Sequence, residues 1–190
     1  MNLYEGIEKR RTIRKFRAPA TPEQLNRILT AGSKAPSRKN TQFWEVVLVE
    51  DPVLVEKISE RKYVLNRGNK PREEKVSPEL EAYAQRQKDS FAKASLILVY
   101  YGIVQTSWAV PFDAASAWLF IENICLAAVA EGLGTRIATF WQGAEKDINQ
   151  IVYAPEGMAL AAAVSIGIPA EEPAPRTLKS QEKWVHRNRF

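Results

Sequence analysis

The sequence contains one cysteine, Cys125, and one histidine, His186. A lone cysteine cannot form a disulfide within the chain. The sequence also lacks the pattern of a signal peptide, which is a positively charged start followed by an apolar stretch. A reducing, cytoplasmic setting is therefore expected. One cysteine and one histidine are too few ligands for a zinc cluster, and they give little basis for Ser-His-Asp or Cys-His catalysis. We therefore expect no metal site, and we expect the chemistry to come from a cofactor that carries its own reactivity.

Long hydrophobic runs are also absent. The longest, residues 96–104 and 158–168, fall well short of the roughly 20 residues that a membrane-spanning helix needs, so no membrane span is expected. No repeat, low-complexity tract or linker divides the chain, and 190 residues that are 45% hydrophobic are enough for one core. We expect a single domain over residues 1–190.

Positive charge exceeds negative charge by five, and the basic residues gather near the two ends of the sequence. This distribution favours an anionic partner, which is either nucleic acid or the phosphates of a nucleotide cofactor or of NAD(P)H. Charge alone does not separate these possibilities. The basic residues concerned are Lys9, Arg10, Arg11, Arg14, Lys15 and Arg17 in the first part, and Lys179, Lys183, Arg187 and Arg189 in the last.

Three helix starts can be located because a capping residue precedes a proline at residues 21–22, 51–52 and 77–78. The first also has capping-box spacing, Thr21 with Gln24, and its helix is expected to stop at Gly32. Asp113 is expected to cap a long apolar helix that ends near residues 131–132. Apolar runs predict strands at 43–49, 96–101, 136–140 and 159–166.

These elements do not follow a regular βαβ alternation, which favours the α+β class. The helix expected from Asp113 is apolar on nearly every face, so it belongs either at the centre of the molecule or at a subunit interface. The segment after Pro169 is rich in proline and charge and is expected to run extended over a surface.

Two polar segments carry the strongest functional signal. The first packs several guanidinium groups and a hydroxyl into seven residues, and arginine provides a rigid set of donors that matches phosphate. The second is a polar turn that leads directly into the first expected strand. They read Arg10-Arg11-Thr12-Ile13-Arg14-Lys15-Phe16 and Ala35-Pro36-Ser37-Arg38-Lys39-Asn40-Thr41-Gln42-Phe43-Trp44.

These segments, followed by Gly132-Leu133-Gly134-Thr135 after the long helix, resemble the nitroreductase family in order and spacing. The family pattern runs R-R-S/T-x-R-x-F/Y, then A-P-S-x-x-N-x-Q-P-W, then G-L-G-S/T. The resemblance implies a mainly antiparallel sheet flanked by helices, a homodimer whose extended C-terminal tail wraps the partner, and bound FMN. Phe43 stands where the family has proline, and residues 61–93 match no part of the pattern.

The resemblance also implies which residues bind FMN. Arg10, Thr12 and Arg14 would contact it, with Arg14 at the phosphate, Arg10 nearer the ring and Arg11 adjacent. The other subunit would supply Pro36, Ser37 and Asn40. The turn after Gly134 would line the isoalloxazine through backbone groups, and a late basic residue would join the phosphate. The turn residues are Thr139 and Phe140, and for the late residue Lys179 is favoured over Arg176.

The implied activity is transfer of hydride from NADH or NADPH to FMN and then reduction of a small acceptor, by a ping-pong mechanism without an essential catalytic side chain. The acceptor would be a nitroaromatic, a quinone, a flavin, an activated double bond or a halogenated ring, and the sequence does not choose among these. A noncatalytic flavin-binding or sensor protein would show the same binding residues. A small basic nucleic-acid-binding domain has only charge in its favour, since no helix-turn-helix, zinc or RNA-binding signature is present.

Overall fold

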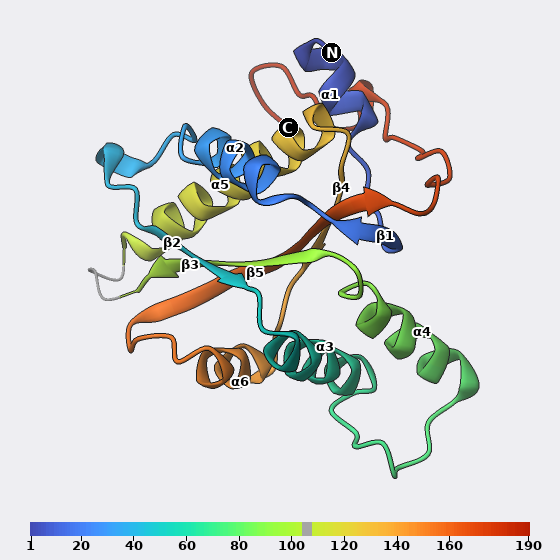
Figure 1. Cartoon of the computed structure of the whole chain (residues 1–190). Coiled ribbons are helices and arrows are strands. Elements are labelled where there is room, and N and C mark those ends of the chain that lie inside the picture. The colour runs from blue at the N-terminus through green and yellow to red at the C-terminus, as the bar shows by residue number, and fades with distance from the viewer. Residues whose placement is uncertain (104–107) are drawn as a thin grey trace.

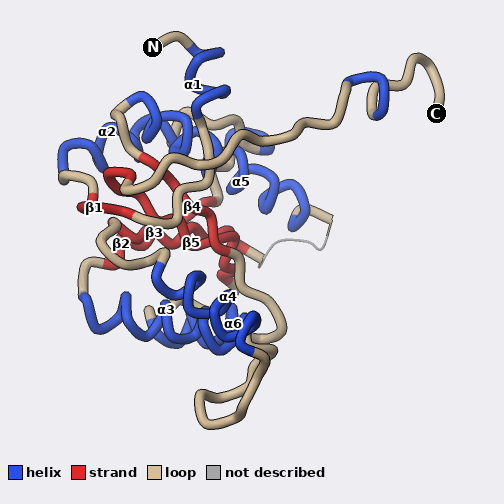
Figure 2. The backbone as a smooth tube through the Cα atoms, turned by 90° about the vertical axis from the view of Figure 1, so that its right-hand side faces the viewer, coloured by secondary structure: helices blue, strands red, loops and turns tan. Residues whose placement is uncertain are grey.

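The structure is a computed structural model, and it describes residues 1–103 and 108–190. A sheet lies between two layers of helices (Figures 1 and 2). The helices are α1 (Leu3–Lys9), α2 (Pro22–Gly32), α3 (Pro52–Asn66), α4 (Pro78–Asp89), α5 (Val110–Ala130) and α6 (Ala144–Ile151), with short 3-10 turns η1 (Arg38–Asn40) and η2 (Gln181–Lys183). The strands are β1 (Phe16–Pro19), β2 (Trp44–Val49), β3 (Ser95–Gly102), β4 (Gly134–Ala138) and β5 (Met158–Pro169).

The strand order is β1-β5-β3-β2, with β4 also paired to β5. Every pairing among these strands is antiparallel, so the α+β class and the antiparallel sheet expected from the sequence are confirmed. Helices α1, α2 and α5 lie on one side of the sheet and α3, α4 and α6 on the other (Figures 1 and 2). An isolated parallel bridge between Thr12 and Thr135 places the arginine-rich segment beside β4.

The three capped helix starts are confirmed. The Thr21 side chain accepts a hydrogen bond from Gln24 N and forms the full capping box. Asp51 and Ser77 cap α3 and α4 by accepting from Val53 N and Leu80 N. Strand β1 was not anticipated, because it has only four residues, one of them proline, and it forms by pairing with the end of β5, far away in the sequence.

The expectation that Asp113 caps the long helix is wrong. Helix α5 begins one turn earlier, at Val110, and its N-cap position is Ala109. Asp113 lies inside the first turn, where its carboxylate is buried against the guanidinium of Arg38. A carboxylate near a helix N-terminus is favourable whether or not it caps, so the local sequence signal is the same in both arrangements.

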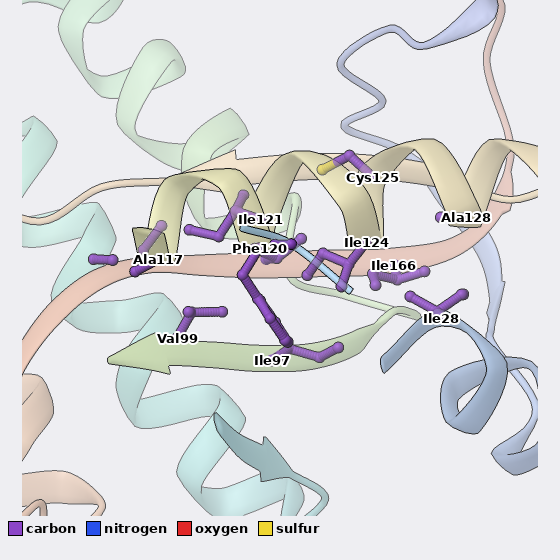
Figure 3. Close-up of a cluster of buried hydrophobic side chains, with 14 of the residues drawn as sticks. Ile28, Ile97, Val99, Ala117, Phe120, Ile121, Ile124, Cys125, Ala128 and Ile166 are labelled. Carbon is purple, nitrogen blue, oxygen red and sulfur yellow. The ribbon is translucent and has the colours of Figure 1, made fainter. Parts of the chain in front are cut away.

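The main core lies between α5 and the sheet. Figure 3 shows Phe120 and Ile124 of α5 directed toward Ile97 of β3 and Ile166 of β5, with Ile28 of α2 beside them. Helices α2 and α5 approach closely at Gly32. A Cβ at that position would lie 2.6 Å from Ile124 Cγ2, so the glycine is required for this helix contact.

Helix α5 is long and apolar enough, by length and composition, to cross a membrane. The uninterrupted runs in the sequence do not reveal this, because polar residues such as Asp113 and Asn123 divide the helix. In the structure its inner face packs against α2 and the sheet, as the core helix of a folded domain does. Its outer face leaves the large apolar side chains of Phe112, Trp118 and Leu119 exposed.

After β5 the chain continues as an extended segment that ends in η2 and projects from the body of the molecule (Figure 2). Residues 174–190 are exposed, including the apolar side chains of Leu178, Trp184 and Phe190. The extended conformation agrees with the sequence. Wrapping of this tail around a partner subunit stays a prediction.

Candidate functional site

The arginine-rich segment and the start of the tail form one surface hollow. It has a volume of about 610 Å³ and is lined by Arg10, Arg11, Thr12 and Arg14 together with residues 171–176. The structure therefore brings together the four residues that the sequence singled out in this segment. Lys179 does not line the hollow, whereas Arg176, the alternative late basic residue, does.

Backbone contacts fix the shape of this hollow. Ile13 N donates to Thr135 O over 2.9 Å, which holds the segment against β4. Glu171 Oε1 accepts hydrogen bonds from the backbone amides of Arg14, at 2.5 Å, and Lys15, at 3.2 Å. The Arg11 guanidinium donates to the carbonyl of Ala174. The tail and the arginine-rich segment thus support each other.

The guanidinium groups differ in how far their charge is already neutralised. Arg10 Nε lies 3.6 Å from Glu122 Oε1 on α5, at the edge of ion-pair range. Among the residues that the structure describes, no carboxylate lies within ion-pair distance of Arg11 or Arg14. Their donors match the oxygens of a phosphate, and such charge-assisted hydrogen bonds are among the strong ones in proteins.

The second predicted cluster, Pro36, Ser37 and Asn40, lies around η1 at the start of α5. Arg38 anchors this turn through two hydrogen bonds to the Asp113 carboxylate, from Nε at 3.1 Å and from Nη2 at 3.2 Å. Ser37 Oγ accepts from the backbone amide of Gln42 at 3.1 Å. Pro36 and Asn40 are exposed.

Within one chain this turn does not reach the arginine-lined hollow. None of residues 36–40 lines it. The turn is attached to α5 at Asp113, and the hollow is attached at Glu122, nine positions later. At 1.5 Å per residue the two anchors are about 13 Å apart along the helix axis.

The third predicted element is the turn after β4, which contains Thr139 and Phe140. The Thr139 carbonyl accepts a hydrogen bond of 2.5 Å from Lys62 Nζ on α3. The same ammonium lies 5.2 Å from the ring centroid of Phe140 and 4.4 Å from that of Trp141. Cation–π contact and the hydrogen bond together hold the turn on α3.

A buried arginine connects this turn with the arginine-rich segment. Arg136, on β4, is 3% exposed, and its Nη2 donates to Gln87 Oε1 over 2.6 Å while its Nη1 has no hydrogen-bond partner. Burial lowers the pKa of Arg136 to about 10, and the nearby charge of Arg14 adds to this. Burial likewise lowers the pKa of Lys62 to about 8, helped by the charge of Arg136. Three cations thus run from the hollow to the turn.

Sequence reasoning missed Lys62 and Arg136 as functional candidates. Arg136 was placed only at the start of an expected strand, although a charged residue inside an otherwise apolar strand is itself a signal. Lys62 gave no comparable signal, since α3 carries several charged residues and only packing shows that this one is buried.

The sequence matches the Nitroreductase family over residues 7–168, a range that contains all three motifs but not the tail. It is 27% identical to an iodotyrosine deiodinase of Thermotoga neapolitana, over 92% of this chain and 91% of that protein. It is also 27% identical to a putative NADH dehydrogenase/NAD(P)H nitroreductase of Methanothermobacter thermautotrophicus, over 97% of this chain and 88% of that one.

Among solved structures, an oxidised iodotyrosine deiodinase bound to FMN and 3-iodo-L-tyrosine superposes with a TM-score of 0.76. The alignment covers both chains completely at 24% identity. A BluB-like flavoprotein from Clostridium difficile 630 superposes with a TM-score of 0.80, also over both whole chains, at 23% identity. These likenesses establish the fold. Because the family match covers most of the sequence, including the arginine-rich segment and the turn after β4, the chain belongs to the nitroreductase family.

Proposed function

We propose that this protein is an FMN-dependent oxidoreductase that takes hydride from NADH or NADPH and passes two electrons to a small acceptor. The observation that carries the proposal is a group of three cations: Arg14 lines the hollow, Lys62 holds the turn after β4 through the Thr139 carbonyl, and the charge of Arg136 interacts with both. The hollow suits a terminal phosphate, and the turn suits a planar ring. The unpartnered Nη1 of Arg136 and the unpaired guanidinium of Arg14 fit a cofactor that brings negative charge.

The geometry supports an order along the site that reverses the one the resemblance implied. Among the arginines that line the hollow, Arg14 is the one whose charge affects Arg136. We therefore assign Arg14 to the end of the site near the turn and the ring. Arg10 and Arg11 lie toward Glu122 and the tail and are assigned to the phosphate. Arg176 lines the hollow, and it is the better late contact than Lys179.

When bound, FMN would supply the hydride-accepting and electron-donating chemistry at its ring. The chain's part is to bind the phosphate with Arg10 and Arg11, to place Arg14 near the ring and to support the ring with the backbone of Thr139 and Phe140. Overall, NAD(P)H, a proton and the oxidised acceptor give NAD(P)⁺ and the reduced acceptor. Because nicotinamide and acceptor would use the same exposed ring face in turn, ping-pong kinetics are expected.

The site is proposed to be completed in a homodimer. The exposed apolar side chains of Phe112, Trp118 and Leu119 form a face of α5 that a second copy of the chain would cover. The exposed turn containing Pro36 and Asn40 lies at one end of this helix, about 13 Å along the axis from its own chain's hollow. In a two-fold dimer built on α5, the turn of one subunit would meet the hollow of the other.

The proposal is tested by recording the visible spectrum of the purified protein, identifying the released cofactor, and adding NADH or NADPH under anaerobic conditions. A yellow protein that releases FMN and bleaches with either nucleotide is expected. A colourless protein that takes up no FMN on titration would contradict the assignment. Bound FMN that neither nucleotide bleaches would instead support the noncatalytic flavin-binding alternative.

The shared site is tested by mixing and refolding an Arg14→Ala chain with an Asn40→Ala chain. A heterodimer with shared sites has one site that carries both substitutions and one that carries neither, so FMN binding and NAD(P)H oxidation should partly recover. If each site is built within one chain, every site keeps one substitution. Recovery no greater than the average of the two homodimers would therefore refute sharing.

A further inference from the structure

Lys62 and Arg136 form a buried cationic pair. Each side chain is 3% exposed, and each is close enough to the other for their charges to interact. Among the described residues neither forms an ion pair with a carboxylate, and their hydrogen-bond partners, Gln87 and the Thr139 carbonyl, are uncharged. Within residues 1–103 and 108–190, the pair therefore has two positive charges and no carboxylate at ion-pair distance to neutralise them.

Such an arrangement is costly unless a negative charge compensates it. Buried charges are normally paired, because transfer of an isolated ion out of water is expensive. Two like charges repel each other in addition. The cost is understandable if the compensating negative charge belongs to a ligand, since ionisable groups with strongly perturbed pKa values cluster at functional sites.

The position of the pair indicates which ligand this is. Lys62 lies beneath the turn of Thr139, Phe140 and Trp141, which is proposed to carry the cofactor ring. Arg136 is close enough to Lys62 and to Arg14, which lines the arginine-rich hollow, for its charge to interact with both.

Unused hydrogen-bonding capacity lies at the same place. Ser165 pairs directly with Arg136 in the antiparallel register of β4 and β5, so the two side chains are neighbours on one face of the sheet. Ser165 Oγ and Arg136 Nη1 are both buried and both lack a hydrogen-bond partner. Two available donors therefore accompany the uncompensated charge.

We propose that Lys62 and Arg136 are positioning residues that compensate the negative charge which FMN gains on reduction, and thereby raise its reduction potential. This rests on the proposed function. A hydride from NAD(P)H adds two electrons and one proton to the ring, which therefore gains one negative charge, and the acceptor later removes both electrons. The pair selects for acceptors that a flavin of raised potential can still reduce.

The pair should also link cofactor reduction to protonation. Burial and the charge of Arg136 lower the pKa of Lys62 to about 8. The other charged or titratable groups facing the pair are Arg14, from the segment before β1, and Tyr83, on α4, both acting on Arg136. A nearby negative charge favours the protonated ammonium, so at pH 8.5 reduction of the bound cofactor should be accompanied by proton uptake at Lys62.

The decisive measurement is the midpoint potential of bound FMN, obtained by anaerobic equilibration with a reference dye. Lys62→Met and Arg136→Gln should each weaken binding of the reduced relative to the oxidised cofactor by about tenfold, which corresponds to a potential about 30 mV more negative for a two-electron couple. Arg136→Lys keeps the charge and should keep the potential. Lys57→Met, at an exposed position of the same helix, is the matched control.

A second readout is the number of protons taken up on reduction at pH 8.5, followed with an indicator dye. The wild type should take up more protons than Lys62→Met. If both variants bind FMN and are reduced by NAD(P)H at the wild-type potential and with the wild-type proton uptake, the inference is wrong while the proposed function stands. If the wild type binds no FMN, both fail. If Arg136→Gln does not fold, the comparison of Lys62→Met with Lys57→Met decides.

Discussion

Replacing Lys62 by methionine should change how the stability of the cofactor-free protein depends on pH. Burial and the charge of Arg136 lower the pKa of Lys62 from 10.5 to about 8 in the folded state. Below pH 8 the Lys62 side chain is charged in both the folded and the unfolded state, so burial of this charge destabilises the folded protein to its full extent. Between pH 8 and 10.5 the unfolded chain binds more protons than the folded one, and the free energy of unfolding therefore rises with pH.

The size of this effect follows from the shift. One pKa unit corresponds to 1.36 kcal/mol, so the full shift is equivalent to about 3 kcal/mol. Allowing for partial solvent screening and for incomplete titration, we expect the wild type to gain about 2 kcal/mol relative to Lys62→Met between pH 7 and pH 10. The methionine variant lacks the ionisable group and retains most of the side-chain volume.

The assay is urea unfolding of wild type, Lys62→Met and Lys57→Met at both pH values. Burial raises the pKa of Cys125 to about 11 and that of Tyr100 to about 12, which opposes the trend of Lys62, but both groups are present in every protein and cancel in the comparison. Lys57→Met should differ from the wild type by the same amount at both pH values. If Lys62→Met does so as well, the buried-ammonium argument is refuted.

Three further outcomes are expected. Arg14→Ala should weaken FMN binding about tenfold or more, and Lys15→Ala much less, measured by fluorescence titration; equal losses would indicate a diffuse basic patch. Arg38→Ala should lower the free energy of unfolding by about 3–5 kcal/mol, because it leaves the buried Asp113 carboxylate unpaired. In urea unfolding, the double variant that also carries Asp113→Ala should recover part of this loss. No recovery would contradict the pairing. Gly32→Ala should cost about 1–3 kcal/mol through overpacking between α2 and α5, and an unchanged midpoint would show that the helices can separate freely.

Much of the fold was predictable because its signals are local. A capping residue such as Thr21 acts on backbone amides within one turn, so the starts of α2, α3 and α4 can be located from a few residues. The apolar runs that became β2, β3 and β5 were also evident. Strand β1 and the role of Asp113 were not, because the first depends on pairing with β5 and the second on a contact with Arg38.

For the candidate site, too, some features follow from local sequence and others depend on contacts between distant segments. The order of three motifs in the sequence was enough to indicate the family, and the family match over residues 7–168 confirms it. The arginines of residues 10–14 could be predicted to bind an anion because arginine matches phosphate wherever the chain places it. These conclusions depend on residue type and spacing alone.

The tertiary structure was needed to show that the positive charge of Arg136 interacts with those of both Arg14 and Lys62. The three residues come from the segment before β1, from β4 and from α3, and the bridge between Thr12 and Thr135 and the packing of α3 bring them together. Whether a charged side chain is solvated or buried without a partner depends on what packs around it, and that information lies far away along the chain. The sequence therefore determined which chemistry this protein contains, and the fold determined where its uncompensated charge lies.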